Sequence, residues 1–142
     1  MTPHRLPPSL RRFLQLWEEG AYWECHEALE GIWLETRSSF YHGLILWASA
    51  WVHWERGNAH GVRAQLRKAR ERLEGCPSPY LGIDVARIRA RCEGVRGVVA
   101  ARPDDWMGRI APERLEVDPG RIRGDEPELR AESGEEGPAA GG

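Results

Sequence analysis

The chain has 142 residues, of which 41% are hydrophobic and 30% are charged, and its formal net charge is −2. This length accommodates one domain, and no apolar run reaches the roughly 18 residues that a transmembrane helix requires. The first residues, MTPHRLPPSLRR, lack the apolar region of a secretory signal. The three cysteines show no CxxC spacing, which argues against a disulfide scaffold or a zinc ribbon. We therefore expect a cytoplasmic protein without a membrane partner.

The first two predicted helices lie close together in the chain. Ser9 is placed to cap the first helix, whose apolar residues recur at helical spacing until Gly20 ends it. The second helix is expected over residues 22–35. It carries a cluster of histidine and glutamate side chains among apolar residues, so its polar groups need an explanation.

The third predicted helix is expected to form the centre of the fold. Ser38 or Ser39 can cap it, it extends over residues 40–56, and Gly57 ends it. From residue 40 to 54 no side chain carries a formal charge if histidine is neutral. A helix that is apolar on nearly every side is normally buried. We therefore expect its tryptophans to lie in the core.

Two amphipathic helices complete the predicted bundle. Asn58 is placed to cap the fourth helix and Asp84 to cap the fifth, and the residues 75–79, GCPSP, must separate them. In both helices the apolar residues are three or four positions apart, opposite charged residues. The sequence thus predicts an all-α fold, a single bundle of about five helices with a buried central helix, over residues 1–112.

The C-terminal part, residues 113–142, is rich in proline, glycine and glutamate. From residue 124 to 142 it has six acidic side chains and one arginine. Such a segment buries too little apolar surface to offset its ordering entropy, so we expect a flexible acidic tail that is disordered or loosely packed. The alternative is an acidic arm that covers basic surface of the bundle. If the first expectation holds, deletion after Ile122 leaves the melting temperature nearly unchanged.

One polar cluster could carry chemistry. His26, Glu27 and Glu30 are spaced so that they neighbour one another on the second helix, while His42 and His53 share a stripe of the third. We expect His26 and Glu30 to face the stripe of His42, Ser49 and His53, so that His26, the two glutamates and His53 or His42 converge between the two helices. The main interpretation is a buried hydrogen-bonded His/Glu network that fixes the helix register. A metal or catalytic site and a polar ligand site are the alternatives; helix bundles build metal sites in this way, but the HExxE pattern lacks the second histidine of a zinc-binding HExxH.

Several motifs in succession resemble one family of small bacterial and archaeal helical proteins, domain of unknown function family 309. They are the HExxE helix, the Gly-Leu-Ile of residues 43–45, and the Gly57-Asn58 turn. Leu46 departs from the glutamine expected there. The resemblance implies a small cytoplasmic helical bundle and no particular activity. The positions that carry it are His26, Glu27, Glu30, Trp33, Gly43, His53, Asn58 and Gly61.

Three functional hypotheses follow. The first is a non-catalytic binding or interaction module with a buried His/Glu network, and a homo-oligomer is compatible with it. The second is a metal-assisted hydrolase that uses the cluster of His26, Glu27, Glu30 and His53 with a divalent metal; no other cofactor is predicted. The third is nucleic-acid binding, which interspersed glutamates and a pI near 6.2 disfavour. It would use basic residues of the fourth and fifth helices, namely Arg63, Arg67 and Arg70 with Lys68 and Arg72 beside them, and Arg87, Arg89, Arg91 and Arg96.

Overall fold

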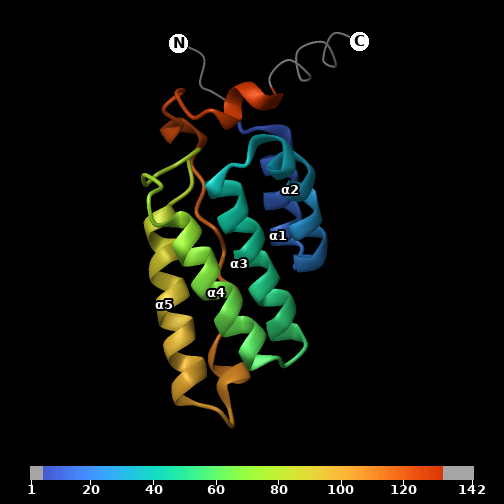
Figure 1. Cartoon of the computed structure of the whole chain (residues 1–142), viewed down its shortest axis with the longest axis vertical. Coiled ribbons are helices and arrows are strands. Elements are labelled where there is room, and N and C mark those ends of the chain that lie inside the picture. Colours follow the sequence, from blue (N-terminus) through green and yellow to red (C-terminus); the bar gives the residue numbers. More distant parts are fainter. Residues whose placement is uncertain (1–4, 133–142) are drawn as a thin grey trace.

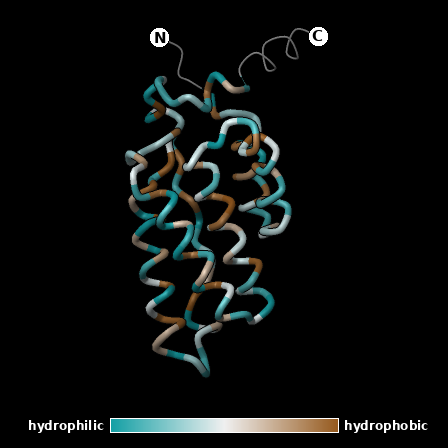
Figure 2. The backbone as a smooth tube through the Cα atoms, in the orientation of Figure 1, coloured by the Kyte–Doolittle hydropathy of each residue, from teal (hydrophilic) through white to brown (hydrophobic). Residues whose placement is uncertain are grey.

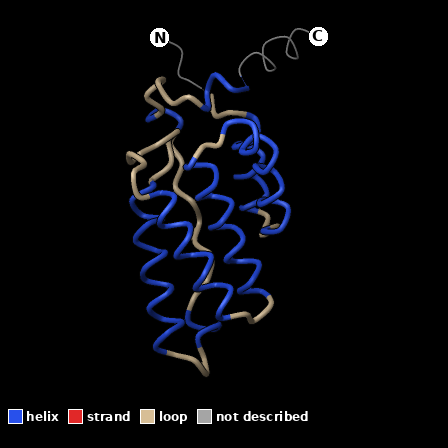
Figure 3. Tube along the Cα trace, viewed as in Figure 1, coloured by secondary structure: helices blue, strands red, loops and turns tan. Residues whose placement is uncertain are grey.

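The fold is an all-α bundle, as the sequence predicted. The computed structural model describes residues 5–132, and within that range it has five labelled α-helices, a further helical segment at residues 128–132, two short 3-10 helices and no strand (Figure 1, Figure 3). In chain order these elements are α1 (Pro8–Glu18), α2 (Tyr22–Thr36), α3 (Ser39–Glu55), α4 (Ala59–Leu73), α5 (Val85–Ala101), η1 (Trp106–Arg109) and η2 (Pro119–Arg121).

Helix α3 is the buried centre of the molecule. The Ser38 side chain caps the start of α3 by accepting a hydrogen bond from the Tyr41 amide. After the helix, Gly57 has a left-handed φ of 68°, a conformation typical of helix C-termini. Trp47 and Trp51 are each only 1% exposed, which confirms the expected tryptophan core. Figure 2 shows hydrophobic residues along α3, whereas α4 and α5 alternate between hydrophobic and hydrophilic positions. The uncharged composition of α3 therefore places it at the centre.

The other helices pack in sequence order on either side of α3. Helix α2 packs on one side of α3 and also contacts α1. Helix α4 packs on the other side of α3 and also contacts α5 (Figure 1). The side chain of Asn58 caps α4 and that of Asp84 caps α5, as predicted. Ser9 does not cap α1: the helix begins at Pro8, where proline's fixed φ suits the first turn, and the Ser9 hydroxyl is used elsewhere.

After η1 the chain returns along the length of the bundle, between its two ends (Figure 1). The indole N–H of Trp17 donates to the carbonyl of Glu113 at 3.0 Å, and Arg87 pairs with the carboxylate of Glu113 at 2.9 Å. Within the returning segment, Val117 forms an isolated bridge with Ile83. This return brings the end of the described chain back to the N-terminal ends of α1 and α3.

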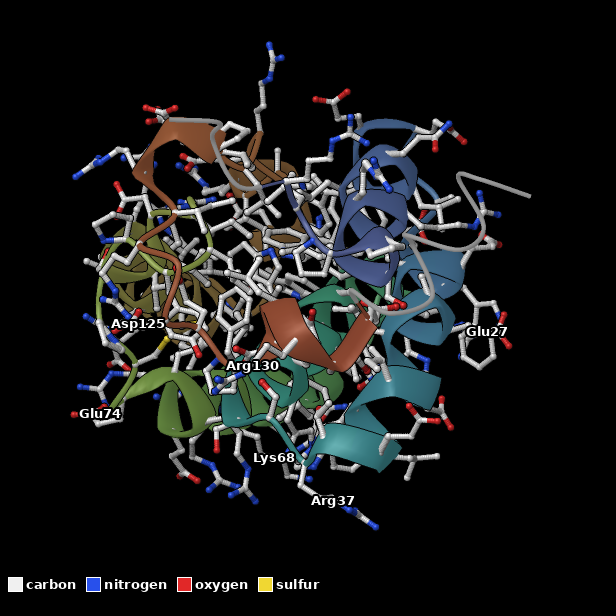
Figure 4. The ribbon with its side chains drawn as sticks, turned by 90° about the horizontal axis from the view of Figure 1, so that it is seen from above. Glu27, Arg37, Lys68, Glu74, Asp125 and Arg130 are labelled. Atoms are coloured by element: carbon white, nitrogen blue, oxygen red, sulfur yellow. The ribbon has the colours of Figure 1, made fainter. Side chains whose placement is uncertain are left out.

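Residues 113–132, here called the C-terminal strap, differ from the predicted loose tail. Its carboxylates Glu126, Glu128 and Glu132 are 2%, 4% and 6% exposed. Figure 4 shows the last helical turn of the strap lying across the end of the bundle. The strap is therefore packed, and it buries these three carboxylates as well as apolar side chains, since Ile122 belongs to the hydrophobic core and Leu115, Val117 and Leu129 pack against it. Residues 133–142, which the same expectation included, lie outside the described residues.

Each buried carboxylate of the strap is held by donors from a different part of the bundle. Glu132 accepts from the Ser9 hydroxyl at 2.6 Å, at the start of α1. Glu128 accepts from Ser38 at 2.6 Å, at the start of α3, and from Tyr80 at 2.7 Å. Two of the three negative charges thus sit at helix N-termini, where the helix dipole favours anions.

Glu126 is held mainly by backbone amides. Its carboxylate accepts from the N–H groups of Leu81 at 3.0 Å, Gly124 at 2.8 Å and Arg123 at 3.2 Å. Burial alone would raise the pKa of Glu126, but these hydrogen bonds to the charged form outweigh it and hold the pKa below its usual range. The amino-acid composition of the strap predicted a loose tail wrongly, because its glutamates accept hydrogen bonds from donors that lie far away in the sequence.

Candidate interaction surface

Helix α2 buries one face and leaves the opposite face open. Cys25, Leu29 and Ile32 point into the core, and the Cys25 thiol donates to the carbonyl of Phe13 at 3.3 Å. At about 100° per residue, the positions opposite this stripe are 23, 27, 30 and 34. Two of them are large and apolar: Trp23 is 52% exposed and Leu34 is 50% exposed. We call these four positions the outward face of α2.

The HExxE residues lie on or beside this outward face. The imidazole of His26 stacks on Trp23 with 5.6 Å between ring centroids, and its Nδ1 lies 3.8 Å from Glu30 Oε2. The side chains of His26 and Glu30 are 27% and 50% exposed, and Figure 4 shows Glu27 directed away from the bundle. The expected buried His/Glu network is therefore wrong, because the aliphatic stripe of α2 takes the inward position.

His42 belongs to a different environment, the joint between α2 and α3. The His42 ring stacks on Trp33 of α2 with 4.3 Å between centroids. The guanidinium of Arg37, the residue after α2, lies 5.3 Å from the Trp33 ring centroid. Burial, with a smaller contribution from Arg72, lowers the pKa of His42. The imidazole is therefore uncharged at neutral pH and acts here as a flat packing surface.

His53, Asn58 and Gly61 together form the turn between α3 and α4. The side-chain oxygen of Asn58 accepts from the Gly61 amide at 3.0 Å, so its NH₂ group faces His53 Nδ1, also at 3.0 Å. His53 Nδ1 must then be the acceptor, which requires a neutral ring. Burial, followed by the charge of Arg56, lowers the pKa of His53 in agreement with this tautomer. A Cβ at Gly61 would collide with the His53 ring.

Gly43 and Ser49 extend the same joint along α3. A Cβ at Gly43 would lie 2.6 Å from Leu73 Cδ2, so glycine lets α4 approach closely. Further along, Gln65 of α4 donates to the Ser49 hydroxyl at 2.8 Å. The family-pattern positions Gly43, Asn58 and Gly61 thus position helices, and Ser49 and His53 of the polar stripe lie at the contact with α4 and the turn before it.

The five candidate residues therefore do not converge. His26 and Glu30 are neighbours on the outside of α2, His42 packs on Trp33, and His53 belongs to the turn before α4. In residues 5–132 no three histidine, cysteine, aspartate or glutamate side chains are grouped so that they could hold a metal ion. The geometry of the described residues gives the hydrolase hypothesis no support.

Most of the arginines that suggested a nucleic-acid surface form ion pairs or hydrogen bonds with other residues of the chain. Arg67 pairs with Glu71, and Arg70 and Arg96 share Glu93. The other engaged arginines are Arg87 and Arg91, which both pair with Glu113, and Arg89, which donates to the carbonyls of Leu73 and Cys76. Six of the eight candidate arginines thus have internal partners, which lowers their capacity to neutralise phosphates.

Comparison with known proteins agrees with the resemblance seen in the motifs. Residues 10–65 match the family model described as Domain of unknown function (DUF309). This DUF309 match spans α1, α2, α3 and the start of α4. A curated relative, "Uncharacterized protein" of Aquifex aeolicus (strain VF5), is 32% identical over 85 residues, which are 57% of this chain. Those residues cover 26% of the relative, so the chain spans about a quarter of its length.

Two sets of residues were not identified from the sequence. The exposed pair Trp23 and Leu34 was not recognised, although a spacing of eleven residues puts both side chains on one face of a helix. The strap glutamates were assigned to a loose tail, although Ser9 and Ser38 are hydroxyl donors at helix starts.

Among the helices of residues 5–132, none has the length and apolarity that crossing a bilayer requires.

Proposed function

We propose that the protein is a non-catalytic interaction module whose outward face of α2 binds a basic, amphipathic segment of a partner protein. The observation that carries this proposal is the pair Trp23 and Leu34, half exposed at 52% and 50% on the side of α2 opposite the core. Exposed tryptophan flanked by charged residues is typical of the residues that dominate protein interfaces. Glu27 and Glu30 lie between the two apolar anchors on the same face.

The charge of α2 favours a basic partner. The helix carries four exposed glutamates, at positions 24, 27, 30 and 35, and neither lysine nor arginine. Complementary charge steers association and determines which partners are accepted. An amphipathic helix with an apolar stripe and flanking lysines or arginines would place apolar side chains on Trp23 and Leu34 and cations on the glutamates.

Two further observations support the proposal. The aligned segment covers 26% of the Aquifex aeolicus relative, so a segment of this kind also occurs beside a much longer stretch of polypeptide. The free thiols of Cys25, Cys76 and Cys92 suit a reducing compartment, and we include a cytoplasmic location in the proposal.

The test uses two labelled helical peptides of equal length and equal apolar stripe, one with lysines and one with glutamates on its polar face. Fluorescence anisotropy should show binding of the basic peptide and none of the acidic peptide. Trp23→Ala and Leu34→Ala should each weaken binding by about tenfold, as loss of an interface anchor does. Met107→Ala is the matched control, because Met107 is a third exposed apolar residue, 40% exposed, that lies outside α2.

Equal affinity for the two peptides, or equal weakening by Met107→Ala, would contradict the proposal. Self-association is the competing outcome for this face. Sedimentation equilibrium of the wild type measures it directly, and a dimer that Trp23→Ala dissociates would assign the outward face to a second copy instead.

A further inference from the structure

The end of the bundle beneath the strap has the chemistry of a receptor for carboxylates. Its donors come from three separate elements: Ser9 at the start of α1, Ser38 at the start of α3, and Tyr80 with the Leu81 amide in the connection before α5. These are hydroxyl and backbone N–H donors from the bundle, and each is directed at a strap glutamate. The site is distinct from the outward face of α2.

Beyond Asp118 the strap is attached to this site through side chains. The Asp118 amide donates to the Gly82 carbonyl at 2.8 Å, but in residues 119–132 the backbone-to-backbone hydrogen bonds of the described strap join strap residues to one another. The attachments to the bundle include the glutamates, the buried Ile122, the partly buried Leu129 and the guanidinium of Arg123, 5.6 Å from the Tyr80 ring centroid. Short linear peptides are recognised in the same way, by a few anchoring side chains.

The site also holds one donor that the strap does not use. Tyr41 is 0% exposed, and its hydroxyl has no hydrogen-bond partner within the described residues. Glu132 and Glu128 are its charged neighbours, and burial followed by these charges raises the pKa of Tyr41, so the phenol stays protonated. A buried donor without a partner costs free energy that a better-placed acceptor would recover.

We propose that this end of the bundle is a binding site for an acidic peptide segment of a partner protein, and that the chain's own strap occupies it in cis. The partner segment would carry carboxylates at the spacing of Glu126, Glu128 and Glu132, with a leucine-like residue after the second. Exchange needs no change in the helices, because the donors are fixed at helix starts and in a short connection. The strap competes with the partner through the high effective concentration that its covalent link provides.

The test uses the full chain carrying Glu126→Gln, Glu128→Gln and Glu132→Gln, and a fluorescein-labelled peptide of residues 119–132. Circular dichroism first establishes that the variant is folded. Fluorescence anisotropy should then show that the peptide binds the triple variant at least about tenfold more tightly than the wild type, whose own strap blocks the site. The same peptide with its three glutamates replaced by glutamine should not bind.

Two matched variants locate the binding. Adding Tyr80→Phe to the triple variant removes one hydroxyl donor and should weaken peptide binding by about tenfold. The full chain with Glu27→Gln and Glu30→Gln on α2 keeps its strap and should bind the peptide no better than the wild type. If the triple variant does not fold, Glu128→Gln alone is measured with the same peptides.

The proposal is overturned if the folded variant fails to bind the peptide, or binds its glutamine form equally well. It is also overturned, in favour of a second copy as occupant, if the wild type forms a concentration-dependent dimer by sedimentation that Glu128→Gln abolishes. Binding unaffected by Tyr80→Phe would show that the peptide lies elsewhere.

Discussion

The glutamates of α2 and those of the strap are chemically alike but lie in opposite environments. Glu27 and Glu30 project from the outside of a helix whose other face is in the core, and Glu30 has a long contact to His26. Glu126, Glu128 and Glu132 are buried and accept hydrogen bonds from four parts of the chain, namely the starts of α1 and α3, residues 80–81 and residues 123–124. The difference shows that local composition does not decide whether a carboxylate is structural; the donors that surround it do.

Deletion of the strap should have the largest effect. Removing residues after Ile122 leaves the Ser9 and Tyr80 hydroxyls and the Leu81 amide without their acceptors. At about 1.5–3 kcal/mol for each hydrogen bond to a charged group, less the entropy of ordering the strap, we expect a loss of about 3–5 kcal/mol. Thermal unfolding checks this, and an unchanged melting temperature would restore the sequence-based expectation of a loose tail.

Two glycine substitutions compare how tightly the contact between α3 and α4 is packed with how open the exposed side of α2 is. Gly61→Ala should destabilise the protein by about 1–3 kcal/mol, because the new Cβ meets the His53 ring. Gly31→Ala should stabilise it by about 0.5–1 kcal/mol, since Gly31 is exposed in mid-helix with nothing within 4 Å of an added Cβ. Urea unfolding measures both, and equal effects would remove the distinction between the two regions.

The helices could be predicted from the sequence because their determinants are local. Caps at Ser38, Asn58 and Asp84, and the left-handed glycine after α3, act within a few residues of the helix ends that they define. The central position of α3 followed from its lack of charge. Each of these signals is contained in a short window of sequence.

The candidate site and the strap could not be predicted in the same way. Helix α2 has apolar residues on both sides, Leu29 inward and Leu34 outward, so its periodicity did not decide which face is buried. The strap contacts join residues far apart in the chain: 123 positions separate Ser9 from Glu132, and 45 separate Leu81 from Glu126. The amino-acid composition of a segment does not indicate which distant residues will form hydrogen bonds with it.

The pH dependence of stability should show two separate declines. The pKa values of His42 and His53 are lowered from 6.5 by burial, with smaller contributions from Arg72 and Arg56, so the unfolded chain binds protons more readily than the folded protein. Their contribution to stability is therefore complete above about pH 6.5 and is lost as the pH falls below it. Urea midpoints measured across this interval should fall, and His42→Gln with His53→Gln should flatten the decline.

The second decline belongs to the strap. Because the folded-state pKa of Glu126 is lowered from 4.5, its contribution is present above that pH and is lost as the pH falls through the folded-state value. Glu126→Gln should remove this part of the acid dependence and leave the histidine part unchanged. An acid limb that persists in Glu126→Gln would assign it to other carboxylates.

The most direct test of the account is the stability of Glu128→Ala compared with Glu30→Ala, measured by urea unfolding of the full chain at neutral pH. Both substitutions truncate a glutamate to the same residue. Glu128→Ala leaves the hydroxyls of Ser38 and Tyr80 without their acceptor and should cost about 2 kcal/mol. Glu30→Ala, on the outward face of α2, should change the free energy of unfolding by no more than about 0.5 kcal/mol. Equal losses, or a larger loss for Glu30→Ala, would contradict the assignment of the strap glutamates to structure and of the α2 glutamates to binding.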